Sequence, residues 1–221
     1  MAIDSLYWST SLLLNFEGAD ASTTVTDISP TPKTATVAGN AQIDTAQFKS
    51  GAAALLLDGS GDYVTFPADA SHDYGSGDFC VEFWWRPTSG TPGATQYLAD
   101  YTVATIGSNN DYAWAIAHNT AGKIVAFMNS GTTQYPVGLL TSTTVLTSAT
   151  WVHIALVRAS GVASLYINGV AEVSGSAAVS LNAPASRLVQ IGKLNNANYA
   201  AGHMDGLRLT KGYARYTATF T

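Results

Sequence analysis

The carboxylates of this chain are the first residues to test for chemistry, because a pair of acids can cleave a glycosidic bond. The sequence holds three glutamates, Glu17, Glu82 and Glu172, and they lie on well-separated segments. A glycosidase needs two carboxyl groups about 5 to 9.5 Å apart. Glu82 is followed by three aromatic residues, so a distant aspartate is the one partner left open for it. We expect Glu82 to lie on a strand face and pair with Arg86 or another polar group, and we expect no catalytic site and no enzyme.

Histidine and cysteine chemistry is equally sparse. The four histidines stand singly, and no two have the HxH or HxxxH spacing of zinc ligands. No serine lies in a GxSxG elbow, and no glycine-rich loop follows a strand and opens a helix. His153 lies between Val152 and Ile154, so we expect a buried, hydrogen-bonded imidazole and not a base. Cys80, the single cysteine, lies in an alternating apolar segment and is expected to be a buried thiol.

Aromatic residues offer the other plausible chemistry, since an exposed ring can stack on the apolar face of a pyranose. Most of the tryptophans sit in alternating segments, where packing in the core is the alternative. Trp84 and Trp85 are adjacent, so one should face the core and the other the outer surface. The candidates for a glycan or partner site combine aromatic rings with amides, and they are Tyr112, Trp114, Asn195, Asn196 and Tyr199.

Composition excludes some classes of function. Charged residues make up 11% of the chain, against about 25% in ordinary soluble domains, which suits a protein packed against neighbours. The net charge is -5 and the ten Lys and Arg residues do not cluster, so we expect no nucleic-acid partner. No apolar run approaches roughly 18 residues, and we expect no membrane span. The start lacks a basic segment followed by an apolar one, so we expect no secretory signal peptide.

Period-two alternation dominates the chain and predicts about a dozen short strands in two packed antiparallel sheets. In the strand predicted from Phe79 to Arg86, the odd-numbered residues share one face and the even-numbered residues the other. Asn168-Gly169 is typical of a type I′ hairpin turn. We expect an N-terminal arm of residues 1–11 and a single domain of residues 12–221. The predicted strands are residues 12–16, 53–57, 63–66, 79–86, 97–101, 113–118, 123–128, 135–140, 151–158, 162–167, 170–173, 187–191 and 204–210.

Four segments resemble the laminin-G-like branch of the concanavalin-A-like lectin and glucanase jelly rolls, and they occur in that family's order. They are GDFCVEFWWRP at residues 77–87, WVHIALVR at 151–158, LYING at 165–169 and HMDGLRLTKGYARYT at 203–217. The likeness runs from about Leu12 to Phe220 and is nearest to modules of bacteriophage structural proteins. It implies an all-β fold, a two-sheet antiparallel jelly-roll sandwich.

The resemblance also implies a calcium site, because many relatives hold this ion with oxygens from loops and strand ends. Glu17 and Asp205 match positions where similar modules place acidic residues, and Asp27 could join from the following loop. In the alternative interpretation, Glu17 and Asp205 cap strand ends or pair with Arg208.

Function is specified less closely, because this architecture carries many activities. The resemblance implies a non-enzymatic phage virion protein, a capsid decoration or tail accessory subunit, that binds other virion proteins as a homo-oligomer or as part of a larger assembly. Leu6, Tyr7 and Trp8 of the arm are the expected partner contacts. The alternative is a carbohydrate-binding module for host-surface or environmental glycans, and both roles can hold together.

Overall fold

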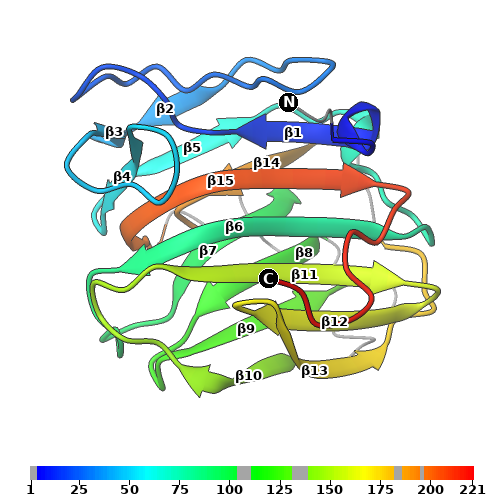
Figure 1. The fold of residues 1–221 in the computed structure, drawn as a ribbon. Helices are drawn as coiled ribbons and strands as arrows, with labels where there is room; N and C mark the ends of the chain where they lie inside the picture. The colour runs from blue at the N-terminus through cyan, green and yellow to red at the C-terminus, as the bar shows by residue number, and fades with distance from the viewer. Residues whose placement is uncertain (1–3, 104–110, 131–138, 182–185, 195–196) are drawn as a thin grey trace.

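The computed structural model describes residues 4–103, 111–130, 139–181, 186–194 and 197–221 as two antiparallel sheets packed face to face (Figure 1). The strands of the first sheet are β1 (Thr10–Leu14), β3 (Gln42–Asp44), β4 (Ala54–Asp58), β6 (Phe79–Pro87), β11 (Val152–Ala159), β12 (Val162–Ile167), β13 (Val170–Ser176) and β15 (Ala201–Lys211). Those of the second are β2 (Thr36–Ala38), β5 (Tyr63–Phe66), β7 (Gln96–Val103), β8 (Tyr112–His118), β9 (Lys123–Met128), β10 (Leu140–Val145) and β14 (Arg187–Ile191). Two short 3₁₀ turns, η1 (Tyr7–Ser9) and η2 (Ala70–His72), complete the described elements.

The eight-stranded sheet has the order β13-β12-β11-β6-β15-β4-β3, with β1 paired to β15, and the seven-stranded sheet has the order β10-β9-β8-β7-β14-β5-β2. This arrangement confirms the predicted all-β, two-sheet antiparallel sandwich. In the part of the chain that the structure describes, no helix has the length and apolar character needed to cross a membrane.

The core lies between the sheets and is built by the expected alternation. On β6, Phe79, Val81, Phe83 and Trp85 are fully buried between the sheets, while the even-numbered residues face outward. Burial of one such side chain stabilises the fold by roughly 1.5–3 kcal/mol. The expectation for the adjacent tryptophans is confirmed, since Trp85 lies in the core and Trp84 is half-buried on the outer face.

Some predicted boundaries differ from the structure. Strand β1 begins at Thr10, because Thr10 pairs with Thr210 of β15, so Thr10 and Ser11 belong to the sheet and not to the arm. Strands β2 and β3 are three residues long and were not predicted, since so short a segment shows no alternation. Strand β10 starts where the predicted strand 135–140 ends, and residues 135–138 lie outside the described part of the chain.

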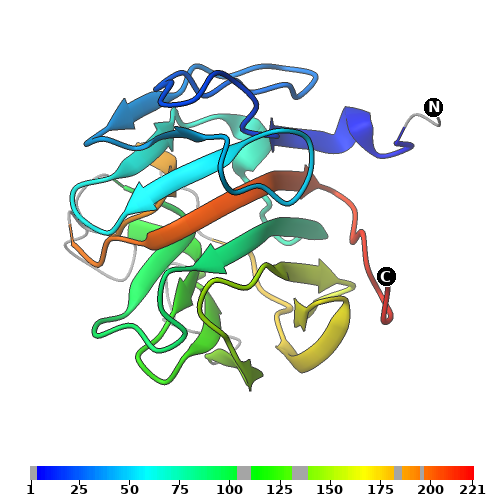
Figure 2. The ribbon, with the colours of Figure 1, turned by 60° about the vertical axis from the view of Figure 1, so that its left-hand side comes forward.

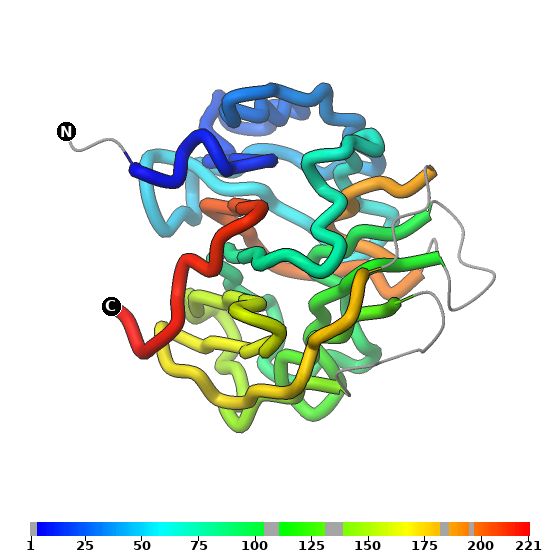
Figure 3. Tube along the Cα trace, turned by 90° about the vertical axis from the view of Figure 1, so that its right-hand side faces the viewer, coloured from blue at the N-terminus to red at the C-terminus, as the bar shows by residue number. Residues whose placement is uncertain are grey.

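The C-terminal strap, residues 212–221, crosses the outer face of the eight-stranded sheet (Figures 1 and 3). Its aromatic residues Tyr216 and Phe220 pack on Cys80 and Tyr166. Phe220 is fixed by the predicted hairpin turn, in which Asn168 and Gly169 have φ of 48° and 80°, and the Phe220 amide donates to the Gly169 carbonyl at 3.0 Å. The strap and residues 4–9, which lead into β1, lie on the same side of the molecule (Figures 2 and 3).

Candidate functional site

A cleft of about 850 Å³ lies on the outer face of the eight-stranded sheet. Its floor is made by outward side chains of three neighbouring strands, because antiparallel register sets them in rows. Trp84 of β6 is opposite His153 of β11, and Glu82 of β6 is opposite Arg208 of β15. The loop at residues 49–50, the turn at 168–169 and the end of the C-terminal strap form its walls.

Glu82 is the charged centre of the floor, and it is 2% exposed. Arg208 donates to its Oε1 from Nε at 2.7 Å and from Nη2 at 2.6 Å. The Tyr216 hydroxyl donates to Oε2 at 2.6 Å, and His153 Nε2 lies 3.2 Å from the same oxygen. Arg215 Nε lies 3.3 Å from Oε1. Both carboxylate oxygens are therefore occupied by partners within the protein.

These contacts decide the protonation of Glu82. Burial by itself would raise the pKa of this carboxyl, but the hydrogen bonds from His153, Arg208 and Tyr216 and the charge of Arg208 outweigh it, and its pKa lies below the ordinary value. Burial and the neighbouring Glu82 raise the pKa of Tyr216, so its hydroxyl keeps its proton and donates. Glu82 is thus an ionised carboxylate on a strand face that pairs with polar groups, as the sequence led us to expect. Its charged partners are Arg208 and Arg215, whereas the sequence had suggested Arg86.

Two tryptophans give the cleft its apolar surface. Trp84 and Trp151 both line it and both are half-buried. The Lys49 ammonium lies 4.1 Å from the centre of the Trp84 ring, and the His153 ring meets Trp84 edge-on at 5.1 Å. His153 is 9% exposed, which confirms the expected buried, hydrogen-bonded imidazole.

The predicted calcium ligands do not come together. Asp205 accepts the Lys49 and Ser50 amides at 2.9 and 2.8 Å, and Glu17 accepts the Ala52 amide at 3.0 Å. Asp27 lies elsewhere and accepts amides that include that of Lys33 at 2.8 Å. Among the described residues, no three His, Cys, Asp or Glu side chains are placed to share a metal ion. N–H groups are directed at each of these three carboxylates, and the calcium site stays a prediction.

The predicted aromatic site on β8 is also not formed as expected. Trp114 is 0% exposed in the core between the sheets, because its side chain points inward from a central strand, so its ring cannot stack on a ligand from solvent. Tyr112 is 5% exposed and packs edge-on against Phe127. Tyr199 is half-buried, and Asn195 and Asn196 lie outside the described residues.

The N-terminal residues Leu6, Tyr7 and Trp8 precede β1 and lie against their own domain. The Tyr7 hydroxyl donates to the Ile28 carbonyl at 3.1 Å, and Leu6 is half-buried. Trp8 is different, since 81% of it is exposed. Asp4, just before them, accepts from Arg208 at 3.0 Å and from Arg215 at 2.6 Å. This segment therefore contacts the same two arginines that pair with Glu82.

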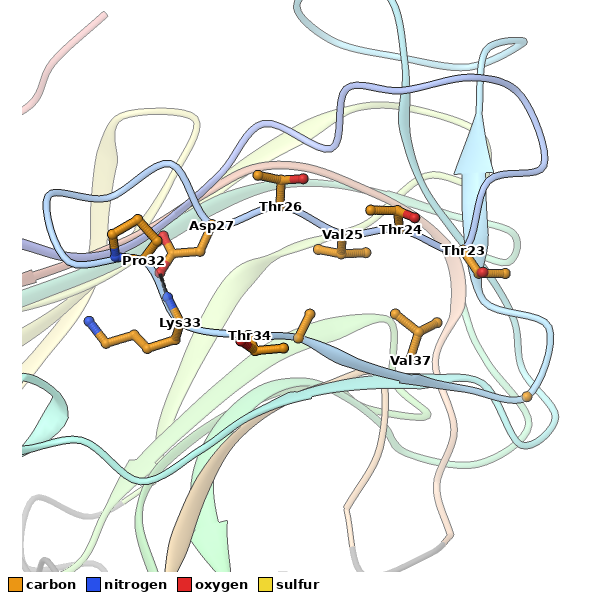
Figure 4. A pocket seen from close by; sticks show the side chains of 11 residues that line it. Thr23, Thr24, Val25, Thr26, Asp27, Pro32, Lys33, Thr34 and Val37 are labelled. Atoms are coloured by element: carbon orange, nitrogen blue, oxygen red, sulfur yellow. Dashed lines mark hydrogen bonds between the residues drawn. The ribbon is translucent and has the colours of Figure 1, made fainter.

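A second hollow of about 630 Å³ lies between residues 23–27 and 32–39 (Figure 4). Threonine and valine side chains make most of its lining. The Asp27 carboxylate accepts the Lys33 amide, drawn in Figure 4, and the Lys33 ammonium donates to the Ser11 and Thr31 carbonyls at 2.8 Å. Its charged groups therefore hold two segments together, and the outer cleft is the stronger candidate for ligand binding.

Comparison with known proteins defines the class. Residues 58–214 match the family model Laminin_G_3, described as the Concanavalin A-like lectin/glucanases superfamily. The chain belongs to this family. A search of curated proteins by sequence found no match.

Solved structures share the fold at low sequence identity. The binding domain of Paraclostridial Mosquitocidal Protein 1 superposes with a TM-score of 0.72 at 17% identity, over 96% of this chain and 51% of that one. The botulinum neurotoxin serotype D binding domain gives 0.70 at 16%, over 96% and 50%. Its ligand-binding domain in complex with N-acetylneuraminic acid gives 0.69 at 16%, over 95% and 49%. The chain spans about half the length of these structures, and the likeness shows the fold alone.

Proposed function

We propose that this chain is a carbohydrate-binding module whose ligand lies in the outer cleft, against Trp84 and Trp151. The observation that carries the proposal is the pair of half-buried tryptophans in a cleft of about 850 Å³. Ligand sites of this kind have volumes of roughly 300–1,000 Å³ and combine apolar surface with a few fixed polar groups.

The chemistry of the cleft suits a sugar. An indole ring covers the apolar face of a pyranose, while neighbouring donors and acceptors receive its hydroxyls. Asn168 lies at the rim and is exposed, and its side-chain oxygen accepts the His153 amide at 2.8 Å. The groups beneath are fixed by the Glu82 contacts, so little ordering is needed when a ligand binds.

Binding without cleavage follows from the state of Glu82. A general acid in a glycosidase needs a raised pKa, whereas the pKa of Glu82 is lowered by its hydrogen bonds against the effect of burial. Its oxygens are also engaged by Arg208, Tyr216 and His153. We therefore propose a non-enzymatic lectin-like role.

The comparisons support the class of ligand. The family description names lectins, and one structural neighbour holds N-acetylneuraminic acid. That neighbour is matched over 49% of its length, so its ligand supports sugar binding in general and does not place a sugar on this chain.

Affinity gel electrophoresis against a panel of soluble polysaccharides, followed by a glycan array, tests the proposal. We expect retardation of the unmodified protein by at least one polysaccharide, and loss of it in Trp84→Ala, since one stacked ring contributes about ten- to hundredfold in affinity. Trp8→Ala is the matched control, because Trp8 is exposed and does not line this cleft. Equal retardation of Trp84→Ala and the unmodified protein would contradict this location, and migration unaffected by every glycan would contradict the function.

A second candidate function is attachment to other virion proteins, as the resemblance to phage modules implies. The observation that favours an attachment surface is Trp8, which is 81% exposed and lies near the start of the chain. Tryptophan is enriched among the residues that dominate binding at protein interfaces, so a ring this exposed suits burial against a partner. We propose this role as an accessory subunit of a capsid or tail, compatible with glycan binding at the outer cleft.

Trp8→Ser tests the attachment surface while keeping the Asp4 ion pairs. Native mass spectrometry of the protein and of virions or virion assemblies that contain it should show the unmodified subunit bound at fixed stoichiometry and the variant released. Full occupancy of the variant would exclude Trp8 as the attachment point.

A further inference from the structure

Most of the charged side chains around the outer cleft pair with one another. Arg208 and Arg215 are matched by Glu82 and Asp4, with all four joined at 2.6–3.3 Å. Lys49 is the remaining charged side chain on the wall, which also includes the last residue, Thr221. In the described chain, no carboxylate lies within ion-pair distance of its ammonium, which sits over the Trp84 ring.

The backbone fixes Lys49 in this place. The buried carboxylate of Asp205 accepts both the Lys49 and the Ser50 amide, which ties this loop to the strand beside Trp84. Lys49 thus lies on a fixed loop, its ammonium is over the indole, and Lys49 itself is exposed. A cation with three donors, held at an aromatic ring and open to solvent, is placed to contact a group stacked on that ring.

We infer that the ligand is an acidic glycan, whose negatively charged substituent, such as the carboxylate of a uronic acid, pairs with Lys49 while its ring stacks on Trp84. This inference rests on the proposed carbohydrate-binding function. The net charge of the chain is -5, which would repel an anionic polymer, so a local cation is needed at the point of contact.

The test compares each acidic polysaccharide with the same polymer after its carboxyl groups are converted to methyl esters. Polygalacturonate, alginate and hyaluronan are suitable probes, with binding measured by affinity electrophoresis and titration calorimetry in low and high salt. We expect esterification and Lys49→Gln each to weaken binding of the acidic form by about tenfold, with Lys49→Arg retaining it and added salt weakening it. Lys123→Gln removes the same charge from the other sheet and should change nothing.

The outcomes separate this inference from the function beneath it. Equal binding of the acid and ester forms, or Trp84-dependent binding of neutral polysaccharides alone, would overturn the inference and leave the lectin-like role intact. A preference for the acid that survives in Lys49→Gln would overturn the assignment to Lys49. Failure of every polysaccharide to bind would overturn the proposed function, and this inference with it.

Discussion

The residue that organises the outer face is Glu82, because its buried carboxylate pairs with Arg208 of β15 and Arg215 of the C-terminal strap, and Asp4 accepts from the same two arginines. Removing its charge leaves Arg208 and Arg215 near an uncharged amide. Breaking a buried ion pair costs about 3 kcal/mol or more, so Glu82→Gln should lower the free energy of unfolding by about that amount. Urea denaturation measures it.

Glu17→Gln is the matched control, since Glu17 is exposed and an amide oxygen can still accept from Ala52. The control should change the free energy of unfolding by less than about 0.5 kcal/mol. A Glu82→Gln protein as stable as the control would show that the cluster adds no net stability.

A second prediction at the residue scale concerns His72, which is 1% exposed and lies 3.3 Å from the Ser11 carbonyl. Burial, helped by Lys33, lowers the pKa of His72 to about 4. The unfolded chain takes up this proton near pH 6.5 and the folded chain only near pH 4, so stability falls as pH drops through this window, by on the order of 3 kcal/mol.

The comparison with His72→Gln isolates this effect, because the other titrating groups are common to both proteins. The Gln side chain can still donate to Ser11 and has no proton to take up. Thermal unfolding from pH 7 to pH 4 should therefore destabilise the unmodified protein more steeply than the variant. Parallel curves would mean that folding does not shift the pKa of His72.

Single residues also show what the sequence could and could not reveal about the site. Alternation predicted that one of Trp84 and Trp85 faces outward and that Glu82 shares that face, and both predictions are confirmed. Nothing in the sequence brings Lys49 to Trp84, since they lie on different segments joined by the amide contacts of Asp205. Trp114 was named as a ligand candidate but lies in the core. Alternation separates the two faces of a strand and does not say which face is buried.

At the scale of elements, strands bounded by clear turn residues were predicted well, and the three-residue strands β2 and β3 were missed. The ranges 63–66, 123–128, 162–167 and 187–191 agree with β5, β9, β12 and β14, because turn residues bound each of them clearly. Strands β2 and β3 are held by their neighbours β5 and β4, and such pairing leaves little trace in a local pattern. The path of the strap could not be predicted, since it depends on contacts with strands far away in sequence.

The strap gives the prediction at this scale. Gly169 has φ of 80°, and a Cβ there would lie 1.9 Å from the Phe220 carbonyl oxygen. Gly169→Ala should therefore displace the end of the strap and open the cover over Cys80. Cys80 is 0% exposed and its pKa is raised by burial, so its reaction with a thiol reagent should become at least about tenfold faster.

Gly61→Ala is the control for backbone strain, because its φ is 79° and an added Cβ meets nothing within 4 Å. It should cost a similar amount of strain, about 1–2 kcal/mol, without exposing the thiol. Equal labelling rates in the two variants would mean that the Gly169–Phe220 contact does not hold the strap in place.

At the scale of the whole molecule, the chain is a concanavalin-A-like sandwich whose outer cleft combines aromatic rings and fixed charges. Family membership leaves the ligand open, because this architecture serves many functions. The location of a bound sugar therefore distinguishes binding in the outer cleft from binding elsewhere on the sandwich.

The most direct measurement is a crystal structure of the protein with the oligosaccharide that binds it best in the panel. The account predicts a sugar ring stacked on Trp84, with an acidic substituent within about 3 Å of the Lys49 ammonium. A sugar bound instead on the outer face of the seven-stranded sheet, or in the hollow between residues 23–27 and 32–39, would contradict it.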